Sequence, residues 1–145
     1  MYPAKLDEKG RLKLPAEFHR YLASLPEKKL FVTSLDRRIA TIYPMQLWEQ
    51  NEKFLENYTE NPDAKENVLF NANDLGSDAD VDAQGRIQFS SQLRRELNIE
   101  GQTVRLQAIN RAIQVLSDAE YQVRRAKSAQ SPEADVKLLQ RAGLK

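Results

Sequence analysis

The first half of the chain combines short stretches that alternate polar and apolar residues with one stretch of helical spacing. The alternation is clearest over Arg11–Leu14, where it predicts a half-buried strand that follows a turn at Lys9-Gly10. Pro15 fits the first position of a helix, and Pro26 ends that helix. In order, we predict an extended entry, a turn, a strand, a helix and a two-stranded hairpin, over residues 2–6, 9–10, 11–14, 15–25 and 29–34 with 39–43.

The same order of elements returns in the second half. Residues 82–86 form a turn, 87–89 a short strand, and Ser90 or Ser91 the N-cap of a short helix. A hairpin over 103–116 follows, and Asp118 caps a final helix. Equivalent residues are 75 apart for Asp7 and Asp82, Gly10 and Gly85, and Arg11 and Arg86, and 74 apart for Asp36 and Asn110 and for Ile39 and Ile113. This constant separation indicates an internal duplication, which decides the predicted fold.

Two acidic segments of helical spacing separate the copies, over 44–58 and 62–75. Their apolar residues form either a helical pack within the chain or a subunit contact, and they are Phe54, Leu55, Tyr58, Val68, Leu69 and Phe70. A polar break at 128–132 precedes a tail that is helical or partly disordered. We divide the chain into a first repeat (1–50), an acidic helical connector (51–75), a second repeat (76–127) and a C-terminal tail (128–145).

Composition narrows the class of protein. Charged residues make up 30% and hydrophobic residues 41%, which indicates a globular chain. No apolar run approaches the about 20 residues that cross a bilayer, so we expect no membrane association. The chain has no cysteine, which excludes disulfides and thiolate metal sites and favours a cytoplasmic location.

The formal net charge of +1 is unevenly distributed. Residues 1–43 carry nine basic and five acidic side chains, residues 44–82 two and ten, and residues 83–145 eleven and six. Two basic regions therefore flank an acidic one, and each basic region begins near one copy of the repeated element. This distribution suits a polyanionic partner on one face, although solvated helix faces also produce it.

In each copy of the repeated element an Asp leads, a Gly follows three residues later, and an Arg comes next. Gly10 and Gly85 supply the positive φ of a tight turn. Asp7 and Asp82 accept backbone N–H groups and fix the shape of the turn, a structural role that we favour over a direct functional one. The Arg projects from the first residue of a strand, where its donor fork suits a phosphate or a guanine edge.

The neighbours of the two arginines differ. Arg11 lies among Lys5, Lys9 and Lys13, and strand alternation puts Lys9, Arg11 and Lys13 on one face. Arg86 stands between two glutamines. We therefore predict that Arg11 and its lysines make the main DNA contact, and that Arg86 serves assembly first and DNA second.

The sequence gives little support for metal binding or catalysis. The acidic run 78–82 resembles a calcium loop, but the twelfth position counted from Asp80 is Ser91 and not a glutamate. His19 is the only histidine, so no histidine metal cluster and no recognisable catalytic triad is present. No glycine-rich phosphate loop occurs either. We expect no enzyme, no catalytic residues, no metal, no cofactor and no small-molecule substrate.

The segments Asp7–Phe18 and Asp82–Phe89 resemble the two Asp-x-x-x-Arg signatures of the bacterial MraZ family. The resemblance covers residues 1–125, and one signature alone would indicate only the wider AbrB/SpoVT superfamily. Two positions depart from the family pattern: His19 stands where an arginine is common, and Ser90 where a proline is usual.

The resemblance implies an α+β fold, a tandem, pseudo-twofold swapped-hairpin β-barrel of the double-psi-like AbrB/SpoVT type with flanking helices. It also implies a ring-shaped homo-oligomer that binds double-stranded DNA with tandem repeats, in promoters of the division and cell-wall gene cluster, as a nucleoid-associated regulator. The signature residues carry over to Asp7 and Arg11 and to Asp82 and Arg86. A ring that repeats Arg11 would raise avidity by about 10²–10⁴.

Two classes of function compete on the sequence alone. The first is an oligomeric DNA-binding regulator that uses the basic element. The second is an oligomeric scaffold or protein-binding module that uses the acidic helices around Trp48 and Phe70, with an antitoxin-like swapped-hairpin protein as a variant. Salt-sensitive DNA binding distinguishes them, because only the first predicts it.

Overall fold

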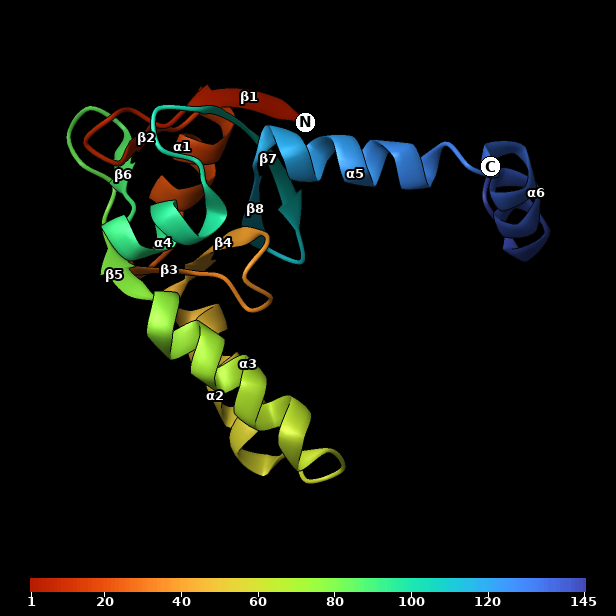
Figure 1. The fold of residues 1–145 in the computed structure, drawn as a ribbon, viewed down its shortest axis with the longest axis horizontal. Coiled ribbons are helices and arrows are strands. Elements are labelled where there is room, and N and C mark those ends of the chain that lie inside the picture. Colours follow the sequence, from red (N-terminus) through yellow and green to blue (C-terminus); the bar gives the residue numbers. More distant parts are fainter.

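The structure is a computed structural model that describes all residues, 1–145 (Figure 1). The helices are α1 (Ala16–Ala23), α2 (Met45–Asn57), α3 (Pro62–Leu75), α4 (Ser91–Leu97), α5 (Asp118–Ser128) and α6 (Pro132–Ala142). The strands are β1 (Tyr2–Lys5), β2 (Arg11–Lys13), β3 (Leu30–Thr33), β4 (Ala40–Pro44), β5 (Ser77–Ala79), β6 (Arg86–Gln88), β7 (Thr103–Ile109) and β8 (Ala112–Leu116).

The two halves of the chain build their sheets together. Six strands form one antiparallel sheet in the order β1-β7-β8-β4-β3-β5, and β2 and β6 form a separate two-stranded ribbon. The first strand of each half pairs with the third strand of the other half, β1 with β7 and β5 with β3. Each half therefore completes the sheet of the other, which the strand pattern along the chain does not reveal.

The α+β class predicted from the sequence is confirmed. The ribbon meets the edges of the six-stranded sheet only through isolated bridges, Leu6 with Leu12 and Val81 with Ile87. The strands therefore do not close a barrel through continuous ladders. Both bridges occupy equivalent places in the two halves, since Leu6 and Val81 each precede a repeated turn by one residue.

One hydrophobic core of 19 buried residues is shared by the two halves. Equivalent positions of both halves contribute to it, such as Leu12 and Ile87, which pair on the ribbon, and Phe18 and Leu93 on the short helices. Truncating such a fully buried side chain to alanine typically costs about 2–5 kcal/mol. The core fixes the ribbon from below, because Leu12 and Ile87 are both fully buried while their strand neighbours are not.

Three predicted helix starts can be compared with the structure. Ser90 is the N-cap of α4, and its hydroxyl accepts the N–H of Leu93 at 3.2 Å, as predicted. Pro15 is the N-cap of α1 rather than its first residue. The prediction of Asp118 as the last cap is wrong, because Ser117 accepts the N–H of Glu120 at 3.1 Å and leaves its neighbour inside the helix. Serine and aspartate are equally good caps, so the sequence could not choose between adjacent ones.

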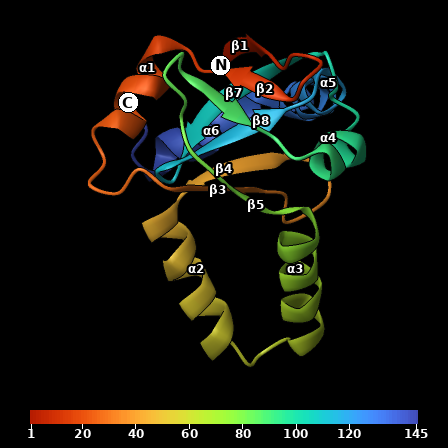
Figure 2. The same ribbon diagram turned by 90° about the vertical axis from the view of Figure 1, so that its left-hand side faces the viewer.

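Helices α2 and α3 form an arm (residues 45–75) that projects from the sheet (Figure 2). Its base is a small second core, in which Trp48 stacks on Phe31 at 4.8 Å between ring centroids. The hydroxyl of Thr33 donates to the carbonyl of Ala72 at 2.8 Å and ties α3 to β3. Farther out the two helices approach the loop that joins them, and Phe54 is 63% exposed.

The last two helices extend from the opposite part of the body (Figure 1). The first turn of α5 is held by Tyr121, whose ring lies 3.9 Å from the guanidinium carbon of Arg105. Every residue from 122 to 145 is exposed. None of the six helices has the length and apolar character needed to span a membrane.

Candidate nucleic-acid interface

The first turn (residues 7–11) is organised by one carboxylate. Asp7 Oδ1 accepts the backbone N–H groups of Lys9 and Arg11, each at 2.9 Å. Its Oδ2 accepts from Arg11 Nε at 2.8 Å. Gly10 takes a φ of +83°, which a residue with a side chain adopts only with strain. The carboxylate thus fixes both the turn and the direction in which the arginine leaves it.

The second turn (residues 82–86) repeats this arrangement atom for atom. Asp82 Oδ1 accepts from the N–H groups of Gln84 and Arg86 at 2.8 and 2.9 Å. Its Oδ2 accepts from Arg86 Nε at 2.9 Å, and Gly85 has a φ of +76°. Identical backbone requirements therefore explain why Asp, Gly and Arg recur at the same spacing in both halves.

Hydrogen bonding keeps both aspartates charged. The N–H of Arg11 is the largest influence lowering the pKa of Asp7, and the N–H of Arg86 does the same for the pKa of Asp82. Each arginine uses only Nε for its aspartate, so the two terminal nitrogens remain unpaired within the chain. Those nitrogens are the ones that bind a phosphate or a guanine edge.

Pairing of β2 with β6 brings the two signatures onto one small surface. Lys13 lies directly opposite Arg86, and Arg11 lies opposite Gln88. Directly opposed residues of an antiparallel pair point to the same face. Arg11, Lys13 and Arg86 therefore share the outer face of the ribbon, while the intervening Leu12 and Ile87 are buried.

Two side chains cross between the turns. The Lys13 ammonium donates to the carbonyl of Gln84, at the tip of the second turn. In the opposite direction, the Gln88 amide donates to the carbonyl of Lys9 at 2.7 Å, at the tip of the first turn. The lysine that follows Arg11 along the chain therefore places its charge beside Arg86, which the sequence had left between two glutamines.

Sequence reasoning missed one participant, Arg94 of α4. Its guanidinium lies against Gly10 and donates to the carbonyl of Phe89 at 2.5 Å, and the whole side chain is only 12% exposed. His19 of α1 lies against Gly85 in the equivalent way. The 75-residue offset between His19 and Arg94 was the available signal, because it places both residues in corresponding positions behind the other half's turn.

The remaining predicted residues lie beside the first turn. A shallow polar cavity of about 310 Å³ opens there, and its lining residues are Lys5, Asp7, Glu8, Lys9, Arg11 and Gly101. The structure thus groups Lys5, Lys9 and Arg11 at the first turn, and Lys13 with Arg86 at the second. All five predicted cations lie on or next to the ribbon.

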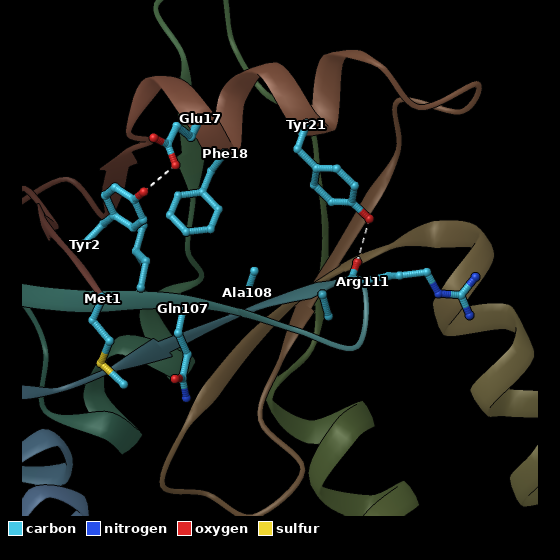
Figure 3. Close-up of a pocket in the computed structure, with 10 residues that line it drawn as sticks. Met1, Tyr2, Glu17, Phe18, Tyr21, Gln107, Ala108 and Arg111 are labelled. Carbon is cyan, nitrogen blue, oxygen red and sulfur yellow. Dashed lines mark hydrogen bonds between the residues drawn. The ribbon is translucent and has the colours of Figure 1, made fainter. Parts of the chain in front are cut away.

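A larger cavity of about 420 Å³ lies away from these residues, between α1 and the β7–β8 hairpin (Figure 3). Apolar side chains line most of it, among them Phe18, Leu106 and Ala108. Tyr21 closes one end by donating to the carbonyl of Arg111 at 2.9 Å, and Tyr2 donates to Glu17 at the other. It contains no group of side chains with evident chemistry, so size alone does not make it the functional site. No group of three or more His, Cys, Asp or Glu side chains in the molecule is placed to hold a metal ion.

Comparison with known proteins gives a consistent result. Residues 2–70 match the family described as "MraZ protein, putative antitoxin-like". The chain is 39% identical to the transcriptional regulator MraZ of Acidobacterium capsulatum, over 71% of this chain and 70% of that protein. This chain belongs to the MraZ family. The MraZ of Koribacter versatilis is 33% identical to it over 70% of this chain and 69% of that protein.

The match to the family description, over residues 2–70, covers the first turn and most of the arm. The second turn lies beyond residue 70 and is connected to the first by the structural duplication described above. Membership in the MraZ family and the shared ribbon face are independent observations, one from sequence similarity and one from geometry.

Proposed function

We propose that this chain is a DNA-binding transcriptional regulator that contacts double-stranded DNA through the outer face of the β2–β6 ribbon. The observation that carries the proposal is the pairing of Lys13 with Arg86 and of Arg11 with Gln88, which joins two separate signatures in one basic face. The names of the relatives, transcriptional regulators, support the same function.

The proposed contacts divide by chemistry. Arg11 and Arg86 present free terminal nitrogens on guanidinium groups whose orientation their aspartates fix, so they suit base edges or bidentate phosphate contacts. Lys5, Lys9 and Lys13 carry point charges suited to phosphates, which position the protein without reading sequence. Fixing the arginines before binding reduces the entropy lost on binding.

We further propose that the chain acts as a ring-shaped homo-oligomer on repeated promoter elements, by resemblance those of the division and cell-wall gene cluster, at the nucleoid in the cytoplasm. Within each subunit the two repeats (1–50 and 76–127) would form a pseudo-twofold, swapped-hairpin unit, and the exchanged pairing of β1 and β5 supports this arrangement. Five cations are few for one chain, whereas linked copies raise avidity by about 10²–10⁴.

The test is the variant Arg11→Ala, assayed by gel shift on a tandem-repeat duplex selected with the full chain from random sequences. Binding should weaken by more than about 100-fold, because every subunit loses the contact. Arg20→Ala is the matched control, since Arg20 is exposed and forms no ion pair. Light scattering should show the same oligomer for both variants. Unchanged binding by Arg11→Ala would remove this face as the DNA site.

A second candidate function is a protein-binding scaffold that uses the arm, favoured by its exposed Phe54 and Phe70. It predicts DNA binding that is absent or insensitive to salt. A regulator that neutralises several phosphates loses affinity steeply with salt, with a slope of about −0.9 per phosphate in log–log form. The same duplex titrated at several salt concentrations therefore separates the two functions.

A further inference from the structure

The C-terminal segment, residues 122–145, makes no packing contact that would bury it. All of its residues are exposed, and it contributes half of the molecule's ten large exposed hydrophobic side chains: Val123, Val136, Leu138, Leu139 and Leu144. A helix as short as α6, with 11 residues, is marginal in water unless another surface covers its apolar face. The segment therefore needs a partner surface.

The arm presents the complementary surface. Phe54 and Phe70 are each 63% exposed, and the ring of Phe54 lies 5.6 Å from that of Tyr58. Residues 45–75 carry seven acidic and two basic side chains, and no carboxylate from Glu49 to Glu66 forms an ion pair. Exposed aromatic rings among unpaired carboxylates suit a partner that is both apolar and basic.

The C-terminal segment has those two properties. It carries six basic and two acidic side chains, and none of its cations forms an ion pair within the chain. Arg124, Arg125 and Lys127 lie together in the last turns of α5. Together the arm and this segment hold seven of the ten exposed large hydrophobic side chains, so covering both would remove most of the exposed apolar surface.

The two surfaces do not meet within one chain. The arm and α5 leave the body in different directions, and α6 lies at the far end of α5 (Figure 1). The direction of α5 is set at its first turn by the Ser117 cap and by the contact of Tyr121 with Arg105. A second copy of the chain is a partner that supplies both surfaces.

We propose that the C-terminal segment of one copy docks on the arm of another, with Leu138 and Leu139 against Phe54 and the basic end of α5 against the arm's carboxylates. This contact is heterologous, so successive copies join head to tail and close into a ring if the rotation allows. It rests on the self-association proposed above and names the surfaces responsible.

The test is a charge exchange in the full-length chain, followed by light scattering over a range of concentrations. Arg124→Glu with Arg125→Glu should convert oligomers to 16.7 kDa monomers, and Glu52→Arg with Glu56→Arg should do the same. All four changes together restore opposite charges across the contact and should restore assembly. Arg20→Glu with Arg95→Glu is the control, because it makes the same charge change on exposed residues of α1 and α4.

Three results would overturn the docking: assembly that survives either reversal, a fourfold variant that stays monomeric while remaining folded by circular dichroism, or a wild-type chain that is monomeric throughout. A second pair of variants tests the apolar part. Leu139→Ser and Phe54→Ser should each weaken association by at least about tenfold, as expected for buried apolar anchors.

DNA binding is measured separately on a short duplex that carries a single element. The Arg124→Glu and Arg125→Glu variant should bind this duplex as the wild type does, since the ribbon is unchanged. Failure of the docking therefore shows in light scattering alone, whereas failure of the proposed function shows as unchanged binding by Arg11→Ala.

Discussion

The first and second turns have the same backbone but different surroundings. In both, an aspartate accepts two backbone N–H groups and one arginine Nε, and a glycine adopts positive φ. The tip residue is Lys9 in one and Gln84 in the other, and the third residue of the following strand is Lys13 in one and Gln88 in the other. By sequence the first turn is rich in cations and the second has almost none.

The crossing side chains change this comparison. Lys13 carries its charge to the second turn, and Gln88 reaches the first. The first turn keeps Lys5 and Lys9, while the second gains one cation. Because the two halves pair with each other, a side chain that follows one turn along the chain can lie beside the other turn in space. We therefore expect the two turns to be more equal as DNA contacts than the sequence indicates.

The largest expected effect concerns the two arginines. Arg11→Ala should weaken DNA binding by more than about 100-fold and Arg86→Ala by about tenfold, since one bidentate contact is worth about 1–3 kcal/mol and the loss recurs in each subunit. The double variant should bind DNA more weakly than either single variant. Fluorescence anisotropy on the selected duplex measures all three, with Arg20→Ala and Arg95→Ala as the control pair. If Arg86→Ala binds like the wild type, the second turn lies outside the interface.

The two glycines should differ in stability. A side chain at Gly10 would overlap the Arg94 guanidinium, whereas one at Gly85 would lie 3.3 Å from His19 Nδ1. Gly10→Ala should lower the free energy of unfolding by about 2 kcal/mol and Gly85→Ala by about 1 kcal/mol. Both place a side chain on a residue with positive φ, but only the first displaces a hydrogen-bonded arginine. Urea unfolding measures both. Gly101→Ala, also at positive φ but with only an ordinary contact to Glu8 at 3.8 Å, should match Gly85→Ala. Equal losses of unfolding free energy at Gly10 and Gly85 would contradict the role of Arg94.

Removing or adding one lysine on the ribbon should alter the salt dependence of DNA binding. Lys13→Gln should reduce the slope of log affinity against log salt by about one, and Gln88→Lys should increase it by about one, since each changes one phosphate contact. Binding isotherms at several salt concentrations give the slopes. If the slope is the same for Lys13→Gln as for the wild type, the Lys13 ammonium remains on the Gln84 carbonyl and does not reach DNA.

Acid should destabilise the protein through both turns. The pKa of Asp7 and of Asp82 is lowered in the fold, so their contribution is present above the unfolded value of about 3.9 and is lost as pH falls through the lower folded value. The Tm should therefore fall between about pH 4 and pH 2. Asp7→Asn with Asp82→Asn should lower the Tm at neutral pH and flatten this fall. An unchanged acid profile would show that these carboxylates do not stabilise the turns.

Local structure was largely predictable from the sequence. The α+β class, the Ser90 cap and the turn-forming role of the two aspartates followed from periodicity and from residues with strong conformational preferences. The exchanged pairing of β1 and β5, the crossing of Lys13 and the position of Arg94 did not follow. These depend on contacts between distant segments, and a charged side chain carries no periodic signal that shows which turn it will reach.

The central claim is that both turns form one DNA-contacting face, and the chain's five glycines test it directly. With ¹⁵N-glycine labelling, the amide signals of Gly10 and Gly85 report the two turns, while Gly76 and Gly143 serve as references. On titration with the selected duplex, Gly10 and Gly85 should shift together with one apparent Kd, and the references should not. A Gly85 signal that stays in place while Gly10 shifts would contradict the shared face and restrict DNA contact to the first turn.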